Sequence, residues 1–248
     1  MTWKDNFSTQ ADIYAKYRPQ YPPELYRFIT NLVKNYHLAW DCATGNGQVA
    51  TSLAPFFDNV IATDASQSQL AQAKPLFNIE YRMAKAEVSG LSSHSVDLIT
   101  VAQAIHWFDF EPFFAEVRRV AHNDTVIAVW GYGLLKISPE LDGILQYLYA
   151  DILGSYWDIE RKHLDVAYQT IPFPFKTIET PQFNIRLQWN LTQLIGYLKT
   201  WSSVQKFIAA KGYNPLTEIA DDLEKTWGNA QMQQEIDWDI YLKVGKVN

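Results

Sequence analysis

Two acids and a pair of glycines near the start of the chain have the spacing of a nucleoside-binding site. An apolar run ends at Asp41 and is followed by Gly45 and Gly47, and a second apolar run ends at Asp64, 23 residues after Asp41. Glycine allows positive φ and a close approach of the backbone to a ligand. A loop that joins a strand to a helix directs free amide N–H groups above the carboxyl end of the strand. The pattern therefore predicts a β-α-β unit whose second acid binds a ribose.

The charge of this segment distinguishes between two cofactors that fit the spacing. Residues 45–50 match the G-x-G-x-x-A pattern that binds the pyrophosphate of NAD. Asp41 would repel that pyrophosphate, and residues 38–73 contain three acids but no lysine or arginine. S-adenosylmethionine (SAM) carries an ammonium and a sulfonium group and no phosphate, so the acidic segment favours SAM. An NAD-dependent oxidoreductase and an ordinary strand–turn–helix are the alternatives.

Residues 41–47 resemble motif I of the class I SAM-dependent methyltransferases, D-x-G-x-G-x-G, and the chain is similar to the type 11 domain family of that class. Asp41, Ala43, Gly45 and Gly47 take the matching positions, with Ala43 in place of the first glycine. The resemblance implies SAM as cofactor and S-adenosylhomocysteine as product. Ala43 is expected to restrict one turn of the loop, because alanine lacks the backbone freedom of glycine.

Two later segments extend this resemblance. Ala86 and Glu87 follow the third expected strand, where the family has an alanine–acid pair beside the adenine. Residues 104–108 match the A-x-x-W-F pattern of the family after its fourth strand. Ligands in open α/β sheets bind at the carboxyl ends of the strands. Gln103 and the pair His106–Trp107 are therefore expected beside the reactive end of SAM.

Residues 14–23 form a segment rich in tyrosine and proline before the first expected helix. Its pattern, Y-A-x-Y-R-P-x-Y-P, resembles the N-terminal segment of the trans-aconitate methyltransferase-like branch of the family. One interpretation is a flap over the cofactor, in which Arg18 binds the methionyl carboxylate bidentately. The other is a strap on the surface. Taken together, the matches predict cofactor binding by Tyr14, Arg18, Asp41, Ala43, Gly45, Gly47, Asp64, Ala65, Ala86, Glu87, Gln103 and Ala104.

Methyl transfer from SAM is an in-line displacement, so the enzyme must hold the acceptor about 3 Å from the methyl carbon. A carboxylate acceptor needs no general base, whereas a hydroxyl, thiol or amine is helped by one. The candidate base is His106, because an unshifted histidine has a pKa near 6.5. The alternative is that His106 only packs beside Trp107. The predicted catalytic residues are His106 and Trp107.

Several aromatic side chains are expected to line the cavity that binds the methyl acceptor. They would suit a small planar molecule, or they would contact the sulfonium through cation–π interactions. The basic run at 161–163 either faces inward and binds a carboxylate of the acceptor or lies on the surface. The resemblance to trans-aconitate-type enzymes implies a small carboxylic acid that becomes a methyl ester. A hydroxyl acceptor and a non-catalytic SAM-binding module are alternatives. The predicted acceptor-binding residues are Tyr17, Trp130, Tyr132 and Trp157.

The composition argues against several other classes of protein. The chain has 248 residues, 48% of them hydrophobic, which is enough for one large α/β domain. A net charge of −6 without a basic cluster argues against nucleic acid as a partner, and no long apolar window predicts a membrane span. The single cysteine, Cys42, excludes a disulfide framework and a cysteine-rich metal site. We expect a cytoplasmic monomer or homodimer that acts on a small soluble molecule without a metal.

The hydrophobic pattern predicts a Rossmann-like α/β fold of the class I methyltransferase type. We expect a seven-stranded, mostly parallel sheet with one antiparallel strand, helices on both faces and a helical lid insertion. After Gly133 the pattern becomes helical, with an apolar helix over 141–153 and a polar helix over 157–167. The expected divisions of a single domain, 1–248, are a flap and helix at 1–37, a SAM-binding core at 38–133, the lid at 134–175 and a C-terminal part at 176–248 that completes the sheet.

Overall fold

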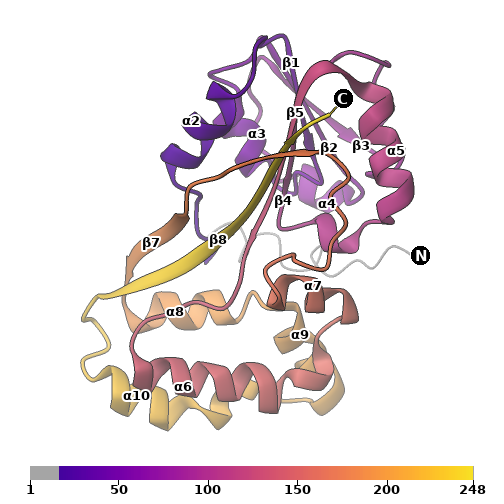
Figure 1. Cartoon of the computed structure of the whole chain (residues 1–248). Coiled ribbons are helices and arrows are strands. Elements are labelled where there is room, and N and C mark those ends of the chain that lie inside the picture. The colour runs from indigo at the N-terminus through magenta and orange to yellow at the C-terminus, as the bar shows by residue number, and fades with distance from the viewer. Residues whose placement is uncertain (1–16, 248) are drawn as a thin grey trace.

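The computed structural model describes residues 17–247, and a mostly parallel sheet forms its centre (Figure 1). The order across the sheet is β3-β2-β1-β4-β5-β8-β6, and β7 also pairs with β8. Strands β1 to β5 run parallel, and β8 runs antiparallel to its neighbours. This confirms the predicted Rossmann-like sheet with an antiparallel strand. The strands are β1 (Leu38–Cys42), β2 (Asn59–Asp64), β3 (Ile79–Met83), β4 (Val96–Ala102), β5 (Ala121–Tyr132), β6 (Lys176–Ile178), β7 (Phe183–Trp189) and β8 (Gln234–Lys246).

The eight strands of the described chain fill seven positions in the sheet. Strand β8 is 13 residues long, and β6 pairs with one end of it while β7 pairs with the other. The outermost position is therefore shared by two short strands. Strand β6 was not predicted from the sequence, because three residues are too few to show an alternating pattern.

Helices cover both faces of the sheet, as predicted (Figure 1). On one face α2 (Pro23–Asn31) and α3 (Gln48–Leu53) pack against alternate residues of β1, β2, β4 and β5. On the other face α5 (Phe110–Val120) covers the remaining residues of β1, β4 and β5. The short helix α4 (Gln67–Leu70) lies against β2 and β3. Strand β4 is buried on both sides, which is why its sequence is almost wholly apolar.

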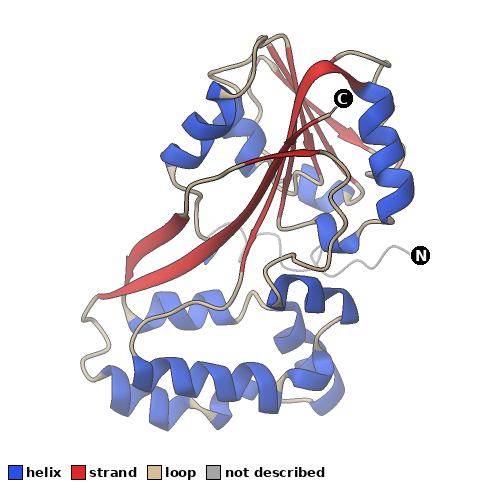
Figure 2. Ribbon diagram, viewed as in Figure 1, coloured by secondary structure: helices blue, strands red, loops and turns tan. Residues whose placement is uncertain are grey.

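A separate layer of helices lies beyond one end of the sheet, as Figure 2 shows. It contains α6 and α7 from the expected lid at 134–175, and three further helices from the segment after β7. Buried leucines of α6, α8 and α10 share one core, so the two segments cover each other's apolar faces. The helices of the layer are α6 (Pro139–Tyr147), α7 (Lys162–Asp165), α8 (Leu191–Leu198), α9 (Ser202–Lys211) and α10 (Ala220–Trp227).

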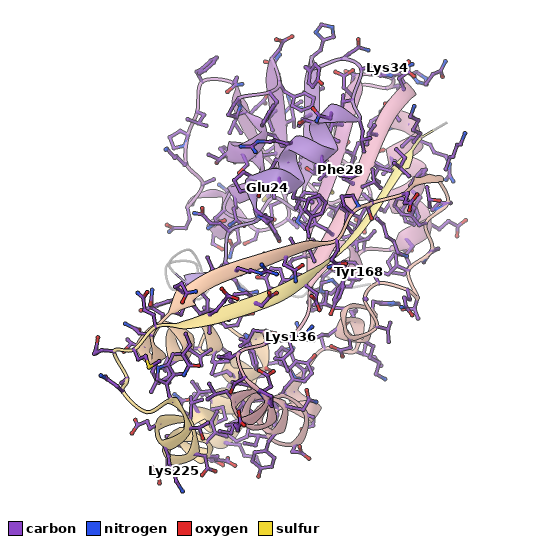
Figure 3. All side chains as sticks on the ribbon, turned by 60° about the vertical axis from the view of Figure 1, so that its left-hand side comes forward. Glu24, Phe28, Lys34, Lys136, Tyr168 and Lys225 are labelled. Atoms are coloured by element: carbon purple, nitrogen blue, oxygen red, sulfur yellow. The ribbon has the colours of Figure 1, made fainter. Side chains whose placement is uncertain are left out.

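The polar helix expected over 157–167 is wrong in extent. The structure has a 3₁₀ turn at Ile159–Arg161 and then the single turn of α7. Ala167 and Tyr168 have φ angles of 53° and 59°, which lie in the left-handed region and end the helix. Tyr168 is thereby placed where the sheet meets the helical layer (Figure 3). In the described part of the chain, no helix has the length and apolar character needed to cross a membrane.

Candidate functional site

A cavity of about 790 Å³ opens at the carboxyl ends of β1, β2 and β4. Parallel strands that share an edge bring the loops after them together, and this is where α/β sheets bind ligands. Tyr14 lies outside the described residues. The other residues predicted to bind the cofactor all line this cavity: Arg18, Asp41, Ala43, Gly45, Gly47, Asp64, Ala65, Ala86, Glu87, Gln103 and Ala104.

Asp41 fixes the glycine loop, the segment after β1 that contains Gly45 and Gly47. Its carboxylate is buried and accepts hydrogen bonds from the Thr44 hydroxyl at 2.5 Å, the Ala50 amide at 3.1 Å and the Thr100 hydroxyl at 2.8 Å. Burial raises the pKa of the Asp41 carboxyl to about 6, although these hydrogen bonds oppose the shift. The carboxylate therefore fixes the loop to β1, β4 and the start of α3.

Asp64 connects the glycine loop to the end of β2. One carboxylate oxygen accepts from the Gly45 amide at 2.8 Å, and the other accepts from the Ser66 amide at 2.8 Å. Gly47 has φ +82°, and a Cβ there would lie 2.5 Å from the hydroxyl oxygen of Tyr81. The conformation at position 47 therefore favours glycine, and any other residue would also have to displace the ring of Tyr81.

Ala43 occupies a left-handed conformation with φ 54°, at the position where motif I normally has glycine. This conformation costs an alanine roughly 1–2 kcal/mol. Substitution Ala43→Gly should therefore raise the free energy of unfolding by roughly 0.5–1 kcal/mol, after the greater freedom of glycine in the unfolded chain is counted. Denaturant unfolding measures the change.

The matched control is Ala50→Gly, because Ala50 lies inside α3 and has helical geometry. There the same change should destabilise the protein by about 1–2 kcal/mol, because glycine disfavours a helix and the substitution also removes a fully buried methyl group. If both substitutions lowered the free energy of unfolding by the same amount, Ala43 would not be strained.

Glu116, a buried acid that was not predicted from the sequence, fixes the loop that contains Ala86 and Glu87 on the opposite side of the cavity. Glu116 of α5 accepts hydrogen bonds from the Ser89 amide at 2.8 Å and from Arg119, whose Nε lies 2.7 Å away. These contacts lower the pKa of Glu116 to about 2. They fix the end of the loop that contains Ala86 and Glu87. The glutamate–arginine spacing of three residues was the available signal, but the same spacing is common on solvated helix faces.

The cavity is acidic where a cofactor would lie. Its described lining contains two cations, Arg18 and Lys85. Such a surface attracts a sulfonium and an ammonium group and repels a diphosphate. The lining contains five carboxylic acids: Asp41, Asp64, Glu87, Asp109 and Glu160.

A second, smaller chamber of about 50 Å³ adjoins the cavity. Four residues line both spaces, namely Arg18, Gln103, Trp107 and Tyr132. The helical layer closes the far side of the chamber. The residues that line the chamber alone are His106, Gly133, Trp157, Asp158, Arg161, Leu164, Tyr197, Trp201 and Ser202.

Gln103 stands between the two spaces in a left-handed conformation, with φ 54°. Its side-chain amide donates to the Tyr132 carbonyl at 3.1 Å and accepts from the Tyr132 amide at 3.3 Å. The hydroxyl of Tyr132 in turn accepts from Nη1 of Arg18 at 3.0 Å. Gln103 lines the large cavity, but its amide group is used to hold Tyr132 and through it Arg18.

His106 faces the chamber from a buried position. Its Nδ1 lies 3.0 Å from the Tyr168 hydroxyl, and its ring centroid lies 4.8 Å from that of Trp107. Burial, with a smaller contribution from Arg161, lowers the pKa of His106 to about 3. The imidazole is therefore neutral near pH 7 and is a much weaker base than the sequence analysis assumed.

The depressed pKa of His106 predicts a loss of stability in acid. In the unfolded chain His106 becomes protonated below about pH 6.5, whereas in the folded chain it stays neutral down to about pH 3. The free energy of unfolding therefore falls as the pH decreases from 6.5 to 3. The variant His106→Gln lacks this effect. The free energy of unfolding of the wild type, relative to that of the variant, should decrease by up to about 1.4 kcal/mol per pH unit below pH 6. Denaturant unfolding between pH 7 and pH 4.5 tests this, and a constant difference would contradict it.

Two of the predicted acceptor-binding residues lie elsewhere. Trp130 is fully buried in the core of the sheet, with its ring edge-on to Tyr21 at 5.5 Å, and lines neither space. It lies on the same face of β5 as Tyr132, but two residues before the carboxyl end of the strand, where the chamber begins. Tyr17 lines a separate groove with Trp189. Tyr132 and Trp157 do line the chamber.

The fold and this acidic cavity together define a class I SAM-dependent methyltransferase. The methyltransferase domain family matches residues 40–129. A Dictyostelium discoideum protein that is named as a methyltransferase is 33% identical over 250 residues, which cover 98% of this chain and 95% of that protein. The chain belongs to the methyltransferase family, and SAM is its cofactor.

Two further relatives agree with this assignment. A Saccharomyces cerevisiae protein named as a SAM-dependent methyltransferase is 26% identical, with 79% of this chain and 80% of that protein covered. A solved structure described as a type II methyltransferase from Anaeromyxobacter dehalogenans has a TM-score of 0.86 and 39% identity, and covers 93% of this chain and 98% of that one. The predictions of a SAM cofactor and of an enzyme are thus confirmed, and the NAD-dependent alternative is set aside.

Proposed function

We propose that this methyltransferase transfers the methyl group of SAM to a carboxylate oxygen of a small acid. The observation that carries the proposal is the chamber beside Trp107, where the histidine is held neutral and arginines supply the charge. A hydroxyl acceptor is helped by a base, and His106 is a poor one. A carboxylate needs none. The resemblance of the N-terminal segment to the trans-aconitate branch supports the same class of acceptor.

The reaction is balanced without proton transfer. A carboxylate oxygen forms a bond to the methyl carbon, the bond from this carbon to sulfur breaks, and its electron pair stays on the sulfur. The products are a neutral methyl ester and S-adenosylhomocysteine. The enzyme contributes by holding the two reactants in line and excluding water, which can lower the barrier by several kcal/mol.

The proposed roles follow the positions of the residues around the two spaces. Asp64 binds the ribose hydroxyls, and the loop at 84–88 borders the adenine. Arg18 binds the methionyl carboxylate, and Trp107 lies beside the methyl group. The segment 134–175, with the helices after β7, acts as a lid over the acceptor. His106 positions Trp107 through ring contact and does not act as a base.

The proposal is tested by incubating the enzyme with SAM and a panel of small carboxylic acids, each paired with the alcohol of the same carbon skeleton. Mass spectrometry should find a singly methylated product from at least one acid, and mild alkali should return that product to the acid. A methylated product that resists alkali, or products from the alcohols alone, would show that the acceptor is not a carboxylate.

A further inference from the structure

Arg161 extends from the lid into the small chamber and is held there by aromatic rings. Its guanidinium carbon lies 4.2 Å from the ring centroid of Trp157 and 5.2 Å from that of Tyr149. Its Nε donates a 2.7 Å hydrogen bond to the Tyr149 hydroxyl. An arginine stacked in this way keeps its planar fork in a fixed direction.

The two basic neighbours of Arg161 lie outside the chamber. Lys162 is exposed. His163 lies with its Nδ1 2.8 Å from the Thr170 hydroxyl and its ring edge-on to Phe110. Of the basic run at 161–163, the chamber lining includes Arg161 and neither neighbour.

The terminal nitrogens of Arg161 keep their hydrogen-bonding capacity. Within residues 17–247 neither Nη atom donates a hydrogen bond, and the carboxylate that approaches the guanidinium is that of Asp165, 4.0 Å from Nε. The side chain of Arg161 is 21% exposed, so the group is only partly solvated. A partly buried guanidinium with two unused NH₂ groups is suited to bind a carboxylate.

The charges around the chamber favour an anion. Two guanidinium groups line it, those of Arg18 and Arg161. Asp158, the carboxylate of the lining, is ion-paired with Lys206. A volume of about 50 Å³ admits only a few atoms, such as a terminal carboxylate. The rest of a larger acceptor would have to remain outside the chamber.

We propose, on the basis of the function proposed above, that Arg161 binds the carboxylate of the methyl acceptor and so selects acids over neutral molecules. A bond from Arg161 to one carboxylate oxygen leaves the other oxygen able to attack the methyl carbon. Arg161 is thus a specificity-determining residue supplied by the lid, whereas the sheet supplies the cofactor site.

The test measures anion binding without methyl transfer. Acetate, propionate and succinate are titrated into the enzyme saturated with S-adenosylhomocysteine, and tryptophan fluorescence is followed, because Trp107, Trp157 and Trp201 line the chamber. Arg161→Gln should weaken carboxylate binding by roughly 10- to 100-fold, the loss of a charge-assisted hydrogen bond. Arg161→Lys should retain part of the affinity. The matched control Lys162→Gln should bind as the wild type does.

Three further measurements decide the proposal. S-adenosylhomocysteine should bind to all variants with the same affinity. If Arg161→Gln weakened the binding of S-adenosylhomocysteine as much as the binding of carboxylates, Arg161 would only support the fold. Acetamide should not compete with acetate, and inorganic phosphate should bind more weakly than propionate. Carboxylate binding that is absent from the wild type, unchanged in Arg161→Gln or matched by phosphate overturns the proposal. Carboxylate binding that is lost in Arg161→Gln while no acid is methylated would establish Arg161 as a carboxylate-binding residue, but it would remove the proposed reaction and with it the identity of the bound acid as the methyl acceptor.

Discussion

Asp64→Ala is expected to weaken the binding of SAM by roughly 1–3 kcal/mol, the usual loss for a hydrogen bond to a charged group. This corresponds to an increase in Kd of about 5- to 150-fold. The substitution removes the acceptors proposed for the ribose hydroxyls and also frees the amides of Gly45 and Ser66. Isothermal titration calorimetry with SAM measures the effect.

Asp58→Ala is the control for this variant. Asp58 precedes β2 at the opposite end from Asp64, is exposed and lies far along the strand from the cavity lining. Its removal should leave the Kd for SAM unchanged. Asp64→Asn, which keeps one carbonyl oxygen as acceptor, should fall between the wild type and Asp64→Ala. An unchanged Kd in a folded Asp64→Ala protein would show that the ribose is held elsewhere.

Gly131→Ala is expected to destabilise the protein by roughly 1–3 kcal/mol and to reduce methyl transfer at the same time. A Cβ at Gly131 would lie 2.7 Å from Oε1 of Gln103 and 2.7 Å from the hydroxyl of Tyr168. Both partners are already engaged, Gln103 with the backbone of Tyr132 and Tyr168 with His106. The methyl group must therefore displace a residue that shapes the chamber.

Gly143→Ala provides the matched control, because nothing lies within 4 Å of a Cβ at Gly143 in α6. This substitution should leave the stability of the protein unchanged or raise it by up to about 1 kcal/mol, since alanine favours a helix. Thermal unfolding and release of S-adenosylhomocysteine are measured on both variants. A Gly131→Ala protein as stable and as active as Gly143→Ala would show that the chamber tolerates the displacement.

The local sequence was sufficient to predict the cavity at the carboxyl ends of the strands. A strand, a glycine turn and a second strand that ends in Asp64 lie close together in the chain, and the rules for parallel sheets then place their ends on one edge. The sequence also predicted that Ala43 restricts the loop, but it did not predict the left-handed conformation of this residue. The contacts of Gln103 were not predicted either, because its partner Tyr132 is 29 residues away.

The acceptor chamber depended on contacts between distant segments. Trp130 and Tyr132 are two residues apart on β5, and both were predicted to line it; only the packed structure shows that Trp130 is in the core. The same holds for Arg161 and Lys162, which are adjacent in sequence, because only the packed structure shows that Arg161 lines the chamber while Lys162 is exposed.

The sequence by itself determined the class of fold, the cofactor and the edge of the sheet at which the large cavity opens, since these follow from hydrophobic pattern, glycine and charge within short segments. The tertiary structure alone decided the surroundings of His106 and which aromatic and basic side chains form the chamber. The physical reason is that burial and electrostatic environment are properties of the assembled neighbours of a residue. Tyr168 and Arg161 reach His106 from parts of the chain more than 50 residues away.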